Sequence, residues 1–282
     1  MKTVGFVDFY LDEWHANNYP DMIRAYAQAS GQEYRLTHAW AELSTPPSGG
    51  RTTEQWCRDF GVTPCQSIEH LCASCDHVIV LSPSNPEKHL AYAKEVFRCG
   101  KHPYIDKTFA PSVSQAEEIF DAATACGVRF FSSSALRYAT ELAPFKSGAR
   151  TVTTTGGGSN LPEYIIHQLE MIVSTLGTGA TQVLYAKHAD QVCVDIAYAD
   201  GRHGKLFYAP ALPFTAMVST DGESSSYHVI ESPFFDHLIA DIFRFFETDE
   251  VSFDTAETME IMRLRETILA AASEPDVWRE VV

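Results

Sequence analysis

Three polar residues, Glu163, His167 and Glu170, are spaced so that a single helix would carry all of them on one side. At about 100° per residue they fall within about 60° of one another. A histidine beside a carboxylate can act as a general base, because the carboxylate sets the tautomer of the ring and raises its basicity. Such pairs are also ordinary on solvated helix faces, so the spacing alone leaves both interpretations open.

This helix is predicted over 162–176, because its other side is apolar. The apolar residues at helical spacing are Ile165, Ile166, Leu169, Ile172, Val173 and Leu176. That side can pack on a sheet. The stripe of Glu163, His167 and Glu170 must then face solvent or a cleft.

A second group of polar residues follows two short apolar segments, 77–81 and 103–106. The first segment is rich in β-branched residues, as is typical of a strand buried on both faces of a parallel sheet. A helix from Asn85 to Gly100 would connect it to the second strand. Ligands bind at the carboxyl ends of such strands, here 82–85 and Asp106-Lys107.

This stretch closely resembles the glucose-fructose oxidoreductase, inositol dehydrogenase and MocA family, in which it reads roughly TPN, H, GKH and EKP. The matching residues here are Ser82-Pro83, His89, Gly100-Lys101-His102 and Asp106-Lys107-Thr108. The resemblance implies that Lys107 is catalytic, between nicotinamide and substrate. It also implies that the residues around it bind the cofactor, namely Ser82, Pro83, Asn85, His89, Asp106 and Lys107 itself. Thr108 replaces the family proline and implies an adjusted loop.

The resemblance extends to the helix over 162–176, where the family has an acid four residues before a histidine on the helix that lines its substrate site. It implies that His167 is the base, that Glu163 orients it, and that Glu170 lies near the substrate. Lys107 would then hold the alkoxide or carbonyl oxygen. Arg137 matches a family Arg-Phe or Arg-Tyr position, where it is either an anion or hydroxyl ligand or part of an interdomain salt bridge.

The largest departure from the family follows the first predicted strand, 3–7. A dinucleotide-binding domain has G-x-G-x-x-G there, whereas this chain has Asp8-Phe9-Tyr10-Leu11-Asp12-Glu13. Asp8, Phe9 and Tyr10 thus stand where the cofactor loop would be, and the carboxylates would make the pyrophosphate site narrower and more acidic. Asp8 is a candidate ligand for a ribose, a metal or a substrate hydroxyl, or a surface carboxylate. Glu42, after the second strand 34–41, is the candidate ribose ligand or is simply exposed.

The order of predicted elements indicates an α/β fold in two domains. Alternating strands and helices over 1–135 predict a Rossmann-like, doubly wound parallel sheet. A run of strands between 151 and 230, closed by two helices, predicts an α+β domain over 136–282 with a mostly antiparallel sheet. In the family this second sheet commonly supports oligomers, so a homo-oligomer is expected.

Composition restricts the partners. The chain has 282 residues, 45% of them hydrophobic, and a formal net charge of -16. This length and hydrophobic content allow two cores, and the charge would repel nucleic acid and anionic membranes. Seven cysteines, no signal-like start and no run of 18 apolar residues lead us to expect a cytoplasmic protein.

The function expected from the resemblance is oxidation of a secondary alcohol of a sugar, polyol or related cyclic substrate with NAD or NADP. NAD is favoured slightly, because no basic residue follows the second strand. One alternative is a catalytically silent sugar-binding or regulatory relative that has lost nicotinamide binding. Another is a metal-assisted lyase or isomerase using Asp8, Glu163 and His167, although their spacing predicts no specific metal site.

Overall fold

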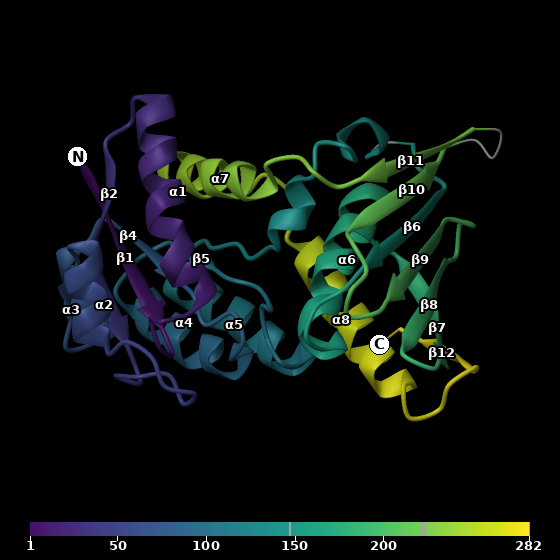
Figure 1. The fold of residues 1–282 in the computed structure, drawn as a ribbon, viewed down its shortest axis with the longest axis horizontal. Coiled ribbons are helices and arrows are strands. Elements are labelled where there is room, and N and C mark those ends of the chain that lie inside the picture. Colours follow the sequence, from purple (N-terminus) through teal and green to yellow (C-terminus); the bar gives the residue numbers. More distant parts are fainter. Residues whose placement is uncertain (147, 221–223, 282) are drawn as a thin grey trace. The chain divides into compact units, whose positions relative to one another are not determined.

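The computed structural model describes residues 1–146, 148–220 and 224–281, and the chain forms two compact units. Unit 1 comprises residues 1–133 and 238–252, and unit 2 comprises residues 134–237 and 253–282. Figure 1 shows the elements of both along the chain.

Unit 1 is built on a parallel five-stranded sheet in the order β3-β2-β1-β4-β5. The β1 and β4 strands lie in its middle and are buried, as their β-branched, apolar sequences predict. This is the predicted Rossmann-like sheet. Its elements are β1 (Lys2–Asp8), α1 (Trp14–Ser30), β2 (Tyr34–Ala41), α2 (Thr53–Phe60), β3 (Thr63–Pro64), α3 (Ile68–Ser74), β4 (His77–Val80), η1 (Pro86–Lys88), α4 (His89–Arg98), β5 (Tyr104–Ile105) and α5 (Val113–Cys126).

The largely apolar residues 128–132 predict a sixth strand after α5, and the structure does not form it in full. It is reduced to one parallel bridge between Phe131 and Tyr104. Its place in the core is instead maintained by aromatic packing, with Phe131 against Tyr104 at a centroid distance of 5.0 Å.

Unit 1 also contains a segment distant in sequence, residues 238–252, which include most of α7 (Phe234–Thr248). Aromatic side chains hold it there: the Phe243 ring lies 4.1 Å from Tyr34 and 4.9 Å from Tyr26, and Phe246 stacks on His77 at 4.5 Å. The two-domain boundary predicted near residue 135 assigns this segment to the second domain. The amphipathic pattern of this segment shows that one face of the helix is buried. It does not show which unit that face packs against.

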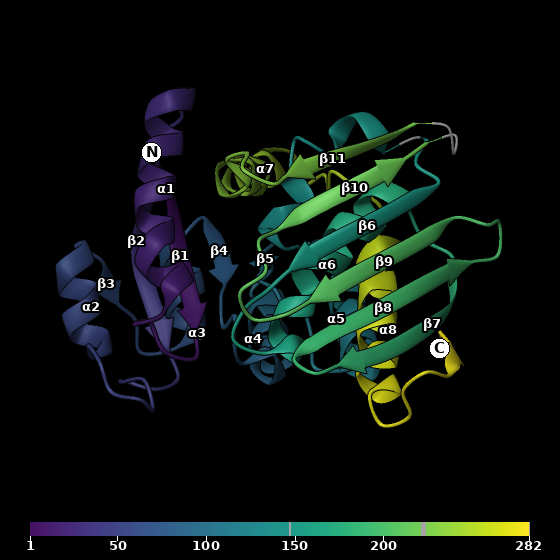
Figure 2. The ribbon, with the colours of Figure 1, turned by 45° about the vertical axis from the view of Figure 1, so that its right-hand side comes forward.

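Unit 2 is built on a mixed seven-stranded sheet in the order β11-β10-β6-β9-β8-β7-β12, in which β6 and β9 are parallel neighbours and the other pairs of described strands are antiparallel. Figure 2 shows this sheet with α6 and α8 on one face. The predicted mostly antiparallel sheet is confirmed, and β12 is an addition that the sequence did not predict. The elements are η2 (Ala135–Tyr138), η3 (Ala143–Phe145), β6 (Thr151–Gly156), α6 (Leu161–Leu176), β7 (Ala180–His188), β8 (Gln191–Tyr198), β9 (His203–Tyr208), β10 (Thr215–Ser219), β11 (Ser225–Val229), α8 (Ala256–Ala271) and β12 (Trp278–Glu280).

None of the helices in the described parts of the chain is both long and apolar enough to cross a bilayer.

Candidate functional site

The α6 helix carries His167, and its first turn is fixed by a reciprocal cap. The Asn160 side chain accepts a hydrogen bond from the Glu163 backbone N–H at 2.9 Å and donates one to the Glu163 carboxylate at 3.1 Å. The first of these bonds satisfies one amide that a helix start leaves unpaired. The Glu163 side chain thus contacts the cap residue of its own helix, and its role in orienting His167 stays a prediction.

Ser134 contacts the His167 ring and fixes its orientation. The Nδ1 atom of His167 lies 2.6 Å from the Ser134 hydroxyl, which also accepts a hydrogen bond from the Leu136 N–H at 3.3 Å. Ser134 is fully buried, whereas His167 is partly exposed. When Nδ1 is the donor in this contact, Nε2 is the proton acceptor of the neutral ring. The sequence does not indicate this role of Ser134, which lies in a run of three serines, 132–134, before Arg137.

Behind Ser134 lies a buried ionic brace. The Glu170 carboxylate accepts hydrogen bonds from the Ser134 backbone N–H at 2.8 Å and from Nε of Arg137 at 2.7 Å. Arg137 also donates to Glu257 at 2.7 Å, and its guanidinium lies 3.9 Å from the centroid of the Phe253 ring. Burial raises the pKa of Glu170, and the adjacent Arg137 opposes that rise.

The prediction that the polar side of α6 faces solvent or a cleft is therefore wrong for Glu170, which is only 3% exposed. The reason is tertiary: an arginine from η2 reaches the helix, so the carboxylate can be buried with a partner. Substrate contacts by Glu170 and Arg137 stay predictions, and this geometry does not favour them, because both side chains are buried and paired.

In unit 1, Lys107 lies at the carboxyl end of the sheet beside the end of β4. Its Nζ is 3.5 Å from the Pro83 carbonyl, its side chain is largely buried, and its peptide bond to Thr108 is cis. Ser82 is buried with a φ of 75°, and its hydroxyl donates to the Asn85 carbonyl at 3.2 Å. The structure thus brings Lys107 to the predicted segment 82–85, because β4 and β5 are neighbours in the sheet.

His89 is placed differently from its predicted cofactor-binding role. Its side chain is fully buried, with Nδ1 2.9 Å from the Phe109 carbonyl and Nε2 2.5 Å from the Leu81 carbonyl. Burial lowers its pKa. His89 thus connects two chain segments next to the site, and its cofactor-binding role stays a prediction.

Asp106 forms a buried pair with His15, a residue that the sequence analysis did not single out. His15 Nδ1 contacts Asp106, which also accepts from Tyr104 Oη at 3.1 Å and from the Lys107 N–H at 2.8 Å. Burial alone would raise the pKa of Asp106, but His15 and then Lys107 hold it below its ordinary value. The pair forms because His15 lies in the first turn of α1, directly after the segment that replaces the glycine-rich loop.

The start of α1 is capped by Glu13. The Glu13 carboxylate accepts hydrogen bonds from the backbone N–H groups of His15, at 2.8 Å, and Ala16. Burial raises the pKa of Glu13. Nearby, Asp8 is only 1% exposed, and among the described residues its Oδ2 has no hydrogen-bond partner. Burial first, and then the charge of Glu13, raise the pKa of Asp8 well above its ordinary value.

This raised pKa gives a testable pH dependence. The folded state holds the Asp8 proton more tightly than the unfolded state, whose pKa is about 3.9, so stability falls as the pH rises from about 3.9 through the folded pKa. We expect Asp8→Asn to raise the free energy of unfolding at about pH 8, by about 1 to 3 kcal/mol, and to have less effect near pH 4. Urea unfolding at both pH values measures this. The exposed Asp121→Asn is the control, and an equal effect of Asp8→Asn at both pH values would contradict the assignment.

Glu42 directly follows β2, at the carboxyl end of that strand, and its ribose-binding role stays a prediction. Lys88 Nζ lies 2.5 Å and Tyr92 Oη 2.7 Å from its carboxylate, and Lys88 lowers its pKa. Lys88 also lies 4.6 Å from the centroid of the Phe9 ring, which packs against Tyr10 at 5.7 Å. A carboxylate accepts about four hydrogen bonds, so Glu42 has capacity for ribose hydroxyls.

The residues therefore fit one part of a nicotinamide dinucleotide and not another. Glu42 fits the adenosine ribose. The start of α1 does not fit a pyrophosphate, because the Glu13 carboxylate already accepts from the amides that would bind it, with Asp8 beside it. Phe9 and Tyr10 replace glycines where the backbone would need to approach the phosphates closely.

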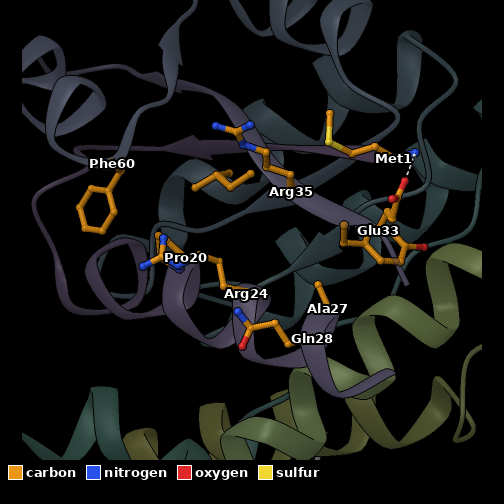
Figure 3. A pocket seen from close by; sticks show the side chains of 10 residues that line it. Met1, Pro20, Arg24, Ala27, Gln28, Glu33, Arg35 and Phe60 are labelled. Carbon is orange, nitrogen blue, oxygen red and sulfur yellow. Dashed lines mark ion pairs between the residues drawn. The ribbon is translucent and has the colours of Figure 1, made fainter. Parts of the chain in front are cut away.

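Two further observations concern other possible sites. A pocket on unit 1, shown in Figure 3, is lined by Met1, Arg24 and Arg35 among others, at the amino ends of β1 and β2. It therefore lies at the opposite end of these strands from Lys107 and Asp8. In the described part of the chain, no three His, Cys, Asp or Glu side chains are grouped to hold a metal ion.

Comparison with known proteins gives one family match. Residues 23–134 match the model of the oxidoreductase family with an NAD-binding Rossmann fold, Gfo/Idh/MocA. The match begins after β1 and the segment Asp8–His15, the part of the chain that departs from the family pattern. None of the curated proteins matches the chain in sequence.

Solved structures share the fold over essentially the whole chain. A candidate myo-inositol dehydrogenase from Sinorhizobium meliloti has a TM-score of 0.74 and 12% identity, with 100% of both chains covered. GenD2 from gentamicin A biosynthesis, in complex with NAD, has a TM-score of 0.77 and 15% identity, covering 100% of this chain and 96% of that one. An oxidoreductase from Agrobacterium radiobacter, in complex with NAD+, L-tartaric acid and magnesium, has a TM-score of 0.75 and 11% identity, covering 99% and 98%.

Proposed function

We propose that this chain, a member of the glucose-fructose oxidoreductase, inositol dehydrogenase and MocA family, oxidises a secondary alcohol of a sugar, polyol or related cyclic compound. The family assignment rests on residues 23–134, which match the family model. NAD or NADP would supply the hydride acceptor. The NAD complexes of GenD2 and of the Agrobacterium protein support the cofactor class. The polyol class is supported by the Sinorhizobium protein and by the small hydroxy acid bound to the Agrobacterium one.

The main observation behind this proposal is the set of contacts that fixes the orientation of His167. Ser134 contacts Nδ1 and is itself fixed through its N–H by Glu170, which Arg137 holds. A catalytic base needs such a fixed orientation, because the proton acceptor must lie within hydrogen-bond reach of the proton that it removes. A histidine on a merely solvated helix face would not need a buried brace behind it.

The residues of this chain would supply the proton chemistry. Nε2 of His167 would accept the hydroxyl proton, with Ser134 holding the ring. The Lys107 ammonium would stabilise negative charge on the reacting oxygen, and its largely buried position strengthens that interaction. Glu42 would accept hydrogen bonds from the adenosine ribose.

A screen of neutral polyols and aldoses with NAD and NADP, followed by absorbance of the reduced nicotinamide, tests the proposal. We expect at least one compound to be oxidised, and Lys107→Ala to lower its turnover at least about tenfold. The control is Lys94→Ala, which removes a lysine from an exposed pair with Glu118. Turnover that is unchanged in Lys107→Ala would refute the assigned role.

A second candidate function is a non-redox, sugar-binding or regulatory relative. The observation that favours it is the capping of α1 by Glu13, which occupies the pyrophosphate position. The two candidates differ in nucleotide binding: only the oxidoreductase requires it.

The homo-oligomer also stays a proposal. Its support is the outer part of the second sheet, where Met217 is 47% and Tyr227 65% exposed. Sedimentation velocity of the native protein tests it, and a monomer at micromolar concentration would contradict it.

A further inference from the structure

We infer that Glu13 is an internal substitute for the cofactor phosphate: its carboxylate occupies the anion position at the start of α1, and a dinucleotide binds unit 1 in the family manner only when that carboxylate is displaced. The inference rests on the proposed function, because it concerns the same cofactor. It assigns Glu13 a role that follows from the disagreement between the family fold and the residues present.

The α1 helix has 17 residues, and the amides of its first turn include those of His15 and Ala16. Both donate to Glu13, one to each carboxylate oxygen. A phosphate would have to accept from the same amides. The carboxylate and a bound phosphate therefore compete for the same hydrogen bonds.

The Asp8 side chain provides a second, independent observation. Its carboxyl group is buried, has an oxygen without a hydrogen-bond partner among the described residues, and interacts electrostatically with Glu13. A buried polar atom without a partner is unfavourable unless a ligand or water satisfies it. The position thus combines an occupied anion site with an unsatisfied acid.

Two basic side chains near the start of α1 already have acidic partners. His15 contacts Asp106, and the guanidinium of Arg51, on the loop before α2, is paired with Asp12 at 2.7 Å and with Asp59 at 3.3 Å. A pyrophosphate arriving at α1 would meet the carboxylates of Glu13 and Asp106 with the local arginine already engaged.

The experiment is calorimetric titration of the full-length protein with NADH. Glu13→Gln removes the charge with little change in size, and Glu13→Ser keeps a good helix cap while leaving space for the phosphate. The matched control is Glu54→Gln, which makes the same change in the first turn of α2. We expect both Glu13 variants to bind NADH at least about tenfold more tightly than the native protein, because one like charge is removed and only one side-chain oxygen then competes for the two amides. The control should bind as the native protein does.

The outcomes separate this inference from the proposed function. Equal and measurable NADH affinity in the native protein and in both Glu13 variants would overturn the inference and leave the oxidoreductase proposal intact. Absence of binding in all of them would overturn both. Because Ser is a favourable N-cap, Glu13→Ser is expected to fold, and thermal unfolding confirms that before titration.

Discussion

Replacement of His167 by asparagine is expected to lower kcat by about 10² to 10⁴-fold, the usual contribution of a positioned general base. Asparagine can keep a hydrogen bond to Ser134, which now contacts Nδ1 at 2.6 Å, but it cannot accept the substrate proton. The expected signature is a fall in kcat with little change in KM, because the base acts in the transition state and not in binding. Steady-state kinetics on a substrate found in the polyol screen measures it.

The matched control is His188→Asn, which changes an exposed histidine at the end of β7 in the same unit. It should leave both constants unchanged. Ser134→Ala should lower kcat less than His167→Asn, because the base remains but is less well oriented. If His167→Asn kept more than about one tenth of the native kcat, His167 would not be the base.

Replacement of Arg137 by methionine is expected to lower the free energy of unfolding by about 3 to 5 kcal/mol, the effect of removing one partner of a buried ion pair. Arg137 and Glu170 both have side chains only 4% exposed and lie 2.7 Å apart. Methionine preserves much of the volume over Phe253 but leaves the Glu170 charge buried without its cation. Urea unfolding followed by circular dichroism measures the loss.

Two comparisons make this prediction specific. Arg279→Met removes an arginine from a largely exposed pair with Glu274 and should change the stability by less than about 1 kcal/mol. The double variant Arg137→Met, Glu170→Gln should recover part of the loss, because the uncompensated charge is also removed. A loss below about 1 kcal/mol in Arg137→Met would contradict a bracing role.

Much of the fold could be predicted because local pattern and burial agree. The β2 strand has the predicted bounds, 34–41, and α6 lies within one residue of the predicted 162–176. The apolar side of α6 is buried as expected. The local pattern could not show which distant segment an element packs against. The assignment of residues 238–252 to unit 1 depends on contacts with the rings of Tyr26, Tyr34 and His77, which are distant in sequence.

The same reason explains the corrections at the candidate site. Helical spacing places Glu163, His167 and Glu170 on one side, but it does not reveal that Arg137 pairs with a buried Glu170 or that Ser134 contacts His167. The altered loop after β1 was visible in the sequence as a loss of glycines. Its consequence, Glu13 capping α1 and His15 pairing with Asp106, required the backbone path.

Calorimetric titration of the native protein and the Glu13→Gln variant with NAD, NADH, NADP and NADPH tests whether this chain is a nicotinamide-dependent enzyme. We expect at least one of the four nucleotides to bind, more tightly to the variant, and to reach micromolar affinity there, about -8 kcal/mol. Absence of binding by all four nucleotides to both proteins would contradict the proposed oxidoreductase function, and the fold would then serve a non-redox function.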